Sequence, residues 1–127
     1  MAINSDMVQD REIKDISLLK CDDGNIVGIV LHYDDSRFMI KAIGMGDSRT
    51  HFSDIPVNSK WIGRTIRSIN HHYNGEFTMI GSWDGNDERV TNYVVEILFN
   101  DGAYLHFKLY NSSDGSNDGT IEVSRVK

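Results

Sequence analysis

Side-chain oxygens gather in one stretch near the C-terminus, and three of them recur at alternate positions. Asp114, Ser116 and Asp118 precede Gly119, which is the order found in the first half of a calcium-binding loop. Such a loop ends on a glutamate that binds through both oxygens, but Arg125 occupies that position here. The stretch is therefore a calcium candidate. A polar turn between two strands is the favoured interpretation, since Asn, Asp, Ser and Gly are the usual turn residues.

The histidines are the next group that could do chemistry, and they are His32, His51, His71, His72 and His106. No two have the helical spacing of a zinc protease, and Cys21 is the only cysteine, so the sequence predicts no metal centre of this kind. His71 and His72 are adjacent in a predicted strand and point to opposite faces. His51 is the most interesting of the five, because it lies in an irregular segment and loops often carry function.

Catalytic motifs are missing from the sequence. It contains no G-x-S-x-G elbow, and the stretch 44–49, GMGDSR, lacks the lysine of a phosphate-binding loop. Cys21 has no local signature of a nucleophile and is expected to behave as a small apolar strand residue. Because no nucleophile can be paired with a base, we predict a protein that is not an enzyme and that needs no cofactor.

Net charge and the distribution of basic residues limit the classes of molecule that the protein is expected to bind. The 127 residues include 19 acidic and 13 basic side chains, a net charge of −6, and the basic residues are scattered. A nucleic-acid backbone is normally bound by clustered Lys and Arg, so we expect no direct contact with nucleic acid. An acidic protein is better suited to a basic protein surface.

The chain ends and cysteine content predict a location. The first residues are polar, no apolar run approaches the length of a membrane span, and one cysteine cannot form an internal disulfide. We therefore expect a cytoplasmic protein that does not enter a membrane. Residues 1–12 are expected to form a flexible leader and residues 13–127 a single β-rich domain.

Alternating apolar and polar residues predict that strands position these groups. The expected strands span residues 15–21, 26–33, 37–45, 64–73, 77–83, 89–99, 103–111 and 120–126. The Asn-Gly pair at 74–75 predicts a hairpin turn. Residues 46–63 contain Pro56 and are expected to form a loop with one short helical turn around residues 53–63. The predicted fold is all-β, with about eight antiparallel strands in a sandwich or a strongly curved sheet.

Two of the strands also predict which face turns inward. In the strand 89–99 the more apolar face should contact the core, and it carries Thr91, Tyr93, Val95, Ile97 and Phe99. In the strand 103–111 the inward residues are Leu105, Phe107 and Leu109. The residues between them form an outward stripe of Tyr104, His106, Lys108 and Tyr110. This stripe is either a solvent face or a contact surface.

Large aromatic residues and one arginine stand beside loop segments. Trp61 and Trp83 either cap the core or anchor a binding pocket, as aromatic residues on loops often do. Arg64 follows Trp61 closely, and its planar guanidinium is suited to an anionic ligand such as phosphate.

Short motifs give the chain a resemblance over residues 13–127. The stretch IGRTIRSI at 62–69, approached through Asp54 and Ile55, and the stretch NSSDG that begins at Asn111 resemble a family of small phage and prophage proteins of unknown function. The family's closing motif carries two tyrosines where this chain has Ser116 and Asn117. A Cys-Cys-Glu of the family is replaced by THFSD at 50–54. The resemblance implies a virus or mobile element inside a bacterial cell.

These observations lead to one functional hypothesis and two alternatives. We expect a non-catalytic phage or mobile-element protein that binds and blocks or sequesters a bacterial host component. That component is a defence protein or a small anionic signalling ligand, and a homo-oligomer is left open. The alternatives are an immunity protein that neutralises a toxin and a small hydrolase acting on a nucleotide-like signal. The expected binding residues are His51, Trp61, Arg64, Trp83, Asn111, Ser113 and Asp114.

Overall fold

The computed structural model describes residues 2–3, 8, 10–44, 49–81, 87–113 and 119–126, with side chains for 8, 10–44, 49–72, 90–112 and 119–126. The described strands are β1 (Ala2–Ile3), β2 (Asp15–Lys20), β3 (Ile26–His32), β4 (Arg37–Ile43), β5 (Arg49–Ser53), β6 (Ile66–Gly81), β7 (Asp87–Phe99), β8 (Tyr104–Ser113) and β9 (Thr120–Val126). One 3-10 turn, η1, spans Asn58–Lys60. Within the described residues, no helix has the length and apolar character that a membrane crossing requires.

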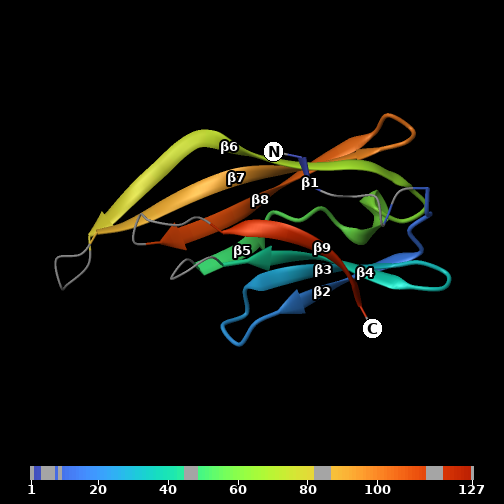
Figure 1. Cartoon of the computed structure of the whole chain (residues 1–127), viewed down its shortest axis with the longest axis horizontal. Helices are drawn as coiled ribbons and strands as arrows, with labels where there is room; N and C mark the ends of the chain where they lie inside the picture. The colour runs from blue at the N-terminus through green and yellow to red at the C-terminus, as the bar shows by residue number, and fades with distance from the viewer. Residues whose placement is uncertain are drawn as a thin grey trace.

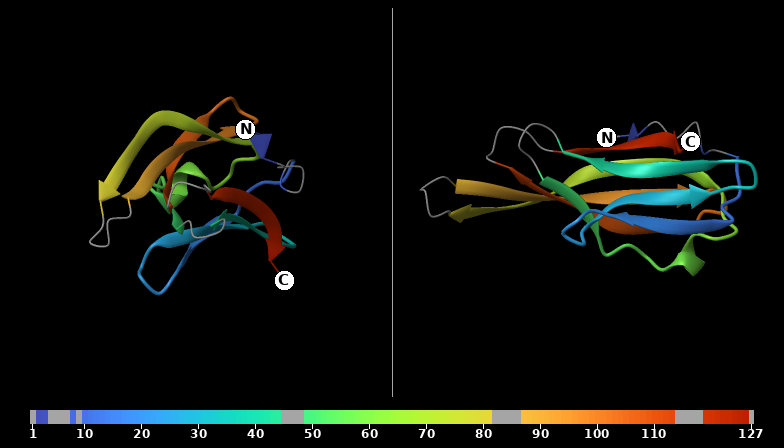
Figure 2. Two further views of the ribbon diagram at one scale, coloured as in Figure 1. Left: turned by 60° about the vertical axis from the view of Figure 1, so that its left-hand side comes forward. Right: turned by 90° about the horizontal axis from the view of Figure 1, so that it is seen from below.

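All the described strands join one antiparallel sheet that curls into a half-barrel. The order of the strands is β1-β6-β7-β8-β5-β3-β4-β9, and β2 pairs with β3 outside this path. The curl places β6, β7 and β8 across from β2, β3 and β4, with β5 connecting the two halves (Figure 1; Figure 2). The prediction of an all-β fold is confirmed, in the form of a strongly curved sheet with one short helical turn inside residues 53–63.

The Asn-Gly pair at 74–75 does not form a hairpin, so this prediction was wrong. The strand β6 continues through it and pairs with β7 on both sides. From Tyr73 to Phe77 β6 advances four residues, while β7 advances only two, from Tyr93 to Thr91. The pair therefore lies in a bulge, which accepts extra residues in one strand and increases its bend. Asn and Gly accept the backbone conformations of a bulge as readily as those of a turn. Because β7 is long enough to pair with β6 on both sides of residues 74–75, the bulge forms here.

The segment 49–53 is a strand and not part of a loop, so this expectation was also wrong. The strand β5 pairs with β8 along its whole length, as in the pair His51 and Tyr110, and its Phe52 pairs with Ile26 of β3. Both partners are distant in sequence, and their ladders override a local pattern that does not favour a strand. Pro56 lies outside β5, where its missing N–H costs nothing.

The core fills the concave side of the curled sheet. The inward faces predicted for β7 and β8 are confirmed, since Val95, Ile97, Phe99, Leu105, Phe107 and Leu109 are all buried. Trp61 is fully buried, and its ring centroid lies 6.0 Å from that of Phe107 and 6.4 Å from that of Phe99. Its indole N–H donates to the carbonyl of Pro56 at 3.2 Å. The segment after β5 is thereby fastened across the open side of the half-barrel.

The outer edge of β2 is partly closed by side chains. The backbone N–H of Ile16 donates to Oδ1 of Asp15 at 2.8 Å, and its carbonyl accepts from Nδ2 of Asn58 at 3.4 Å. An edge strand with free N–H and C=O groups is a template for pairing with another chain. These two bonds leave the N–H and C=O groups of Ile16 unavailable for pairing with another strand.

Trp61 is expected to contribute more to stability than any exposed residue near it. Replacing Trp61 with Ala should lower the free energy of unfolding by about 3–5 kcal/mol, because it removes a buried aromatic side chain and leaves a cavity. Urea denaturation followed by circular dichroism measures the change. The matched control is Val57→Ala, whose side chain is 66% exposed and whose loss should cost less than about 0.5 kcal/mol. Equal losses for the two variants would contradict the placement of Trp61 in the core.

Candidate functional site

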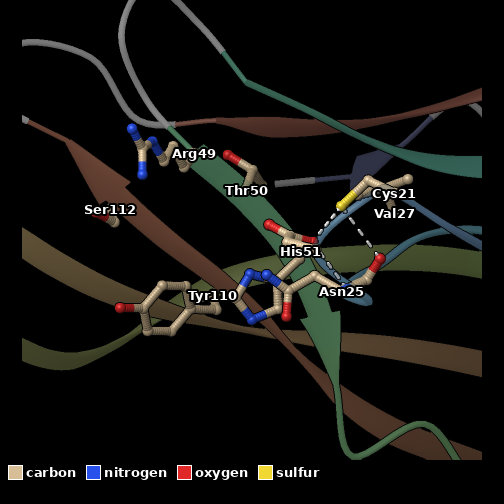
Figure 3. A pocket seen from close by; sticks show the side chains of 9 residues that line it. Cys21, Asn25, Val27, Arg49, Thr50, His51, Tyr110 and Ser112 are labelled. Atoms are coloured by element: carbon tan, nitrogen blue, oxygen red, sulfur yellow. Dashed lines mark hydrogen bonds between the residues drawn. The ribbon is translucent and has the colours of Figure 1, made fainter.

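A hollow of about 480 Å³ lies where the turn between β2 and β3 meets the outer face of β5 and β8. Its floor is formed by two residues of β5, Arg49 and His51, and by their cross-strand partners Ser112 and Tyr110 on β8. Alternation along β5 directs Phe52 into the core, so Arg49 and His51 point outward. Figure 3 shows these side chains beside one another, with Cys21, Asn25 and Val27 on the opposite side.

The wall of this pocket is the tight turn after β2. Its backbone is closed by the N–H of Cys21, which donates to the carbonyl of Asn25 at 2.9 Å. Gly24 has a φ of 86°, a conformation that glycine adopts without steric cost. The carboxylate of Asp23 fixes the turn further, since its Oδ1 accepts the N–H of Asn25 at 2.9 Å. The wall is thus held by its own hydrogen bonds.

A hydrogen bond between Cys21 and Asp23 keeps the thiol protonated, which is the opposite of what an activated thiol requires. The Cys21 thiol donates to Oδ1 of Asp23 at 2.6 Å. This bond raises the pKa of Cys21 and lowers the pKa of Asp23, so the sulfur stays protonated and the carboxylate stays charged. A nucleophilic cysteine needs the reverse arrangement, a neighbouring cation that lowers the thiol pKa.

His51 packs flat against an aromatic ring. Its imidazole is stacked on Tyr110 with centroids 4.6 Å apart and an interplanar angle of 29°. Partial burial lowers the pKa of His51, and the attraction of Asp23 opposes this without overcoming it. The ring is therefore neutral at pH 7, and it is a planar surface with one polar edge.

Charge is distributed unevenly along the pocket. Arg49 is exposed and brings a positive charge to one end. The negative charge of Asp23 acts on His51. Arg49 and His51 are two residues apart on β5, which corresponds to about 6.6 Å along an extended strand. The pocket therefore has a cationic end and an end that accepts hydrogen bonds.

Asn111 lies beneath the floor of this pocket and does not line it. It is fully buried, and its Oδ1 accepts from Oγ1 of Thr50 at 2.9 Å and from the N–H of Gly119 at 2.8 Å. Its Nδ2 donates to Oγ1 of Thr91 at 3.2 Å. One amide therefore connects β8 to β5, to β7 and to the residue that precedes β9. Of the expected binding residues, His51 lines the pocket and Asn111 supports it.

The other expected binding residues are not brought to this pocket. Trp61 is in the core, and the guanidinium of Arg64 lies over the ring of Phe99, 5.3 Å from its centroid. Ser113 is described only as the backbone end of β8. Outside the described residues lie Trp83 and the calcium candidate with Asp114, Ser116 and Asp118. Among described residues there is no cluster of three His, Cys, Asp or Glu that could hold a metal ion.

Sequence reasoning missed most of the lining residues, and two signals pointed toward them. The first signal is the sequence DDGN at 22–25, between the strands expected at 15–21 and 26–33, which is typical of a hairpin turn and supplies Asp23 and Asn25 to the wall. Tyr110 belongs to the stripe of four residues on β8 whose alternation with buried residues is confirmed. Cys21 was expected to be a small apolar strand residue, but it is exposed and follows the end of β2.

Comparisons of this chain with protein-family models, with curated proteins and with solved structures give no match. The resemblance to the phage family therefore depends on the motifs quoted for it. The pocket is the strongest structural basis for a functional hypothesis.

Asn111 is expected to be essential for stability. Asn111→Ala should lower the free energy of unfolding by about 3 kcal/mol, because each buried donor or acceptor left without a partner costs about 1–3 kcal/mol. The matched control is Asn92→Ala on the outer face of β7, where the change should stay within about 0.5 kcal/mol. Chemical denaturation of both variants measures the difference. Similar values would show that the amide of Asn111 does not hold the four segments together.

The hydrogen bond between Cys21 and Asp23 is expected to keep the thiol unreactive. Asp23→Asn removes the carboxylate whose hydrogen bond, and to a lesser extent whose charge, raises the pKa of Cys21, so a larger fraction of thiolate should form and alkylation by iodoacetamide at pH 8 should become several-fold faster. Mass spectrometry of the alkylated protein over time measures the rate. Asp22→Asn makes the same change in net charge one residue away and should leave the rate near that of the original protein. An equal acceleration in both variants would assign the effect to net charge alone.

Proposed function

We propose that this chain is a non-catalytic binding protein that captures a small anionic ligand in the pocket between the β2–β3 turn and strands β5 and β8. The observation that carries the proposal is the pocket itself. Its volume of about 480 Å³ lies within the range of about 300–1,000 Å³ that is typical of small-molecule sites. An exposed arginine at one end, Arg49, suits an anion because its planar guanidinium can donate two parallel hydrogen bonds.

The chemistry of the remaining lining residues favours binding over catalysis. The Cys21 thiol is held protonated by Asp23, and the lowered pKa of Asp23 makes this carboxylate a poor base at neutral pH. His51 is stacked on the ring of Tyr110, an arrangement that does not activate a hydroxyl or a thiol. A nucleophile and a base in contact are the usual signature of covalent catalysis.

The proposed setting of this function is supported by a resemblance in the sequence. The resemblance around Asn111 supports a phage or mobile-element protein in the cytoplasm of a bacterial host. In that setting, the proposed role of ligand capture is to sequester a small anionic signal of the host. The net charge of −6 favours a second candidate, an immunity protein whose acidic surface covers a basic toxin.

The test is capture of an anion by the intact protein. The purified chain is incubated with a small-molecule extract of bacteria, desalted and examined by native mass spectrometry. A discrete adduct that is released unchanged on denaturation is expected. Arg49→Gln should weaken its binding by about tenfold or more, since hydrogen bonds to charged groups contribute about 1.5–3 kcal/mol. Arg37→Gln, which removes an exposed arginine from β4, should bind the adduct normally.

Three outcomes would overturn the proposal. An adduct that binds Arg49→Gln as tightly as the original protein would place the ligand elsewhere. Release of a chemically altered compound, with turnover by the purified protein, would show an enzyme. No small adduct, together with protection of cells from a co-expressed toxin, would favour the immunity protein.

A further inference from the structure

The two ends of the pocket differ in chemistry, and this difference specifies a class of ligand. We infer that the pocket binds a nucleoside monophosphate, with its phosphate at Arg49 and its base and ribose at His51, Tyr110 and the β2–β3 turn. This inference rests on the proposed function, since it names the class of anion that the pocket would hold. Besides a negative charge, the ligand must then carry an aromatic ring and hydrogen-bond donors.

The phosphate end is formed by a directly opposed pair on neighbouring strands. Arg49 of β5 is the cross-strand partner of Ser112 of β8, and both line the pocket. A guanidinium recognises phosphate oxygens in a forked geometry, so the exposed Arg49 is the phosphate-binding group of this end, and the buried Ser112 lies beside it. The neighbouring inward residue of β8, Asn111, forms hydrogen bonds with three other segments. The backbone at this end of the pocket is therefore fixed.

The ring end is the next outward pair along the same two strands. His51 and Tyr110 are cross-strand partners and already form a stacked aromatic pair. Aromatic side chains are the usual surface on which a nucleobase stacks, and stacking tolerates any base because each has a π-face. A neutral imidazole suits this contact, because a planar uncharged ring can stack on a base without a counter-ion. Val27 adds an apolar group to the lining.

The wall sets the direction in which such a ligand would lie. Asp23 is charged, it is near His51, and two of its roughly four lone-pair sites accept from Cys21 and Asn25. The remaining sites are suited to ribose hydroxyls or to an amino group of the base, while the same charge repels a phosphate. The phosphate is therefore directed to the opposite end, where Arg49 lies.

The distance between the two ends fits a ligand of this length. Consecutive outward residues of a strand are about 6.6 Å apart, so the phosphate and ring positions are separated by one intervening group. In a nucleoside monophosphate that group is the ribose. Inorganic phosphate or a sugar phosphate would use only the Arg49 end, and a nucleoside only the His51 end. Binding of the whole molecule should exceed binding of either part.

The test is isothermal titration calorimetry with the full chain and matched probes. The probes are the 5′-monophosphates of adenosine, guanosine, cytidine and uridine, the four free nucleosides, ribose 5-phosphate and inorganic phosphate. At least one nucleotide is expected to bind about tenfold or more tightly than both its own nucleoside and ribose 5-phosphate. The loss of stacking on one aromatic surface typically corresponds to about 5-fold to 150-fold in affinity.

Variants separate the two ends. Arg49→Gln should weaken the preferred nucleotide by about tenfold or more and leave its nucleoside unchanged. Tyr110→Leu should weaken both by a similar factor and leave ribose 5-phosphate unchanged, while Tyr110→Phe should restore the stacking that the leucine lacks. Arg37→Gln is the control for net charge. Thermal unfolding of every variant establishes that it is folded, and the Arg49→Gln and Tyr110→Phe results remain decisive if Tyr110→Leu does not fold.

Two results would overturn the inference, and they are distinct from failure of the proposed function. If ribose 5-phosphate binds as tightly as every nucleotide, the pocket is an anion site without a ring position. If no nucleotide binds but an Arg49-dependent anion is captured from the bacterial extract, the proposed function holds and the ligand belongs to another class. If neither nucleotide nor extract gives Arg49-dependent binding, both proposals fail.

Discussion

The buried amide of Asn111 is the constraint on which the arrangement of the strands depends. It lies on the same strand face as the buried Leu105, Phe107 and Leu109, and a polar group in that position is tolerated only when its hydrogen bonds are made. Thr50, Thr91 and Gly119 make those bonds from three other segments. A Cβ atom at Gly119 would collide with Thr50 Oγ1 and lie 2.7 Å from the carbonyl of Ile43, so only glycine fits beside this junction.

This inner junction determines what the outer face presents. Because Thr50 and Phe52 point inward, toward Asn111 and the core, the residues between and before them must point outward. Arg49 and His51 are therefore displayed on a backbone that is fixed from behind. The same relation holds on β8, where Tyr110 and Ser112 flank Asn111. A binding surface on rigid strands keeps its geometry better than one on loops, which explains how a shallow outer face could act as a specific site.

Local patterns predicted the strands and their inward faces, whereas distant pairings decided the rest. Alternation was sufficient for the stretches 94–99 of β7 and 104–109 of β8, where burial follows parity, whereas Val90 and Ser112 on the outward faces are buried as well. It failed for β5, whose strand character depends on ladders with β8 and β3. It also failed for the Asn-Gly pair at 74–75, since the same residues permit a hairpin or a bulge. His51 was singled out as a loop residue, yet its position comes from a strand. The pocket required knowledge that the turn at 22–25 lies against β5, which the pair Ile26 and Phe52 brings about.

The pocket opens on the convex outer surface of the half-barrel, and this has a kinetic consequence. A ligand held inside a barrel must wait for strands or loops to separate, so its arrival is gated by the protein's own motion. Here the floor belongs to the outer face of strands β5 and β8, and the wall is a turn that is closed by its own hydrogen bonds. Arrival of the proposed ligand would therefore be governed by diffusion and by the charge at the rim, and differences in affinity among ligands would reside in their dissociation rates. For the proposed ligand, the occupied fraction would therefore rise promptly when the ligand concentration rises, and would fall only as fast as the ligand dissociates.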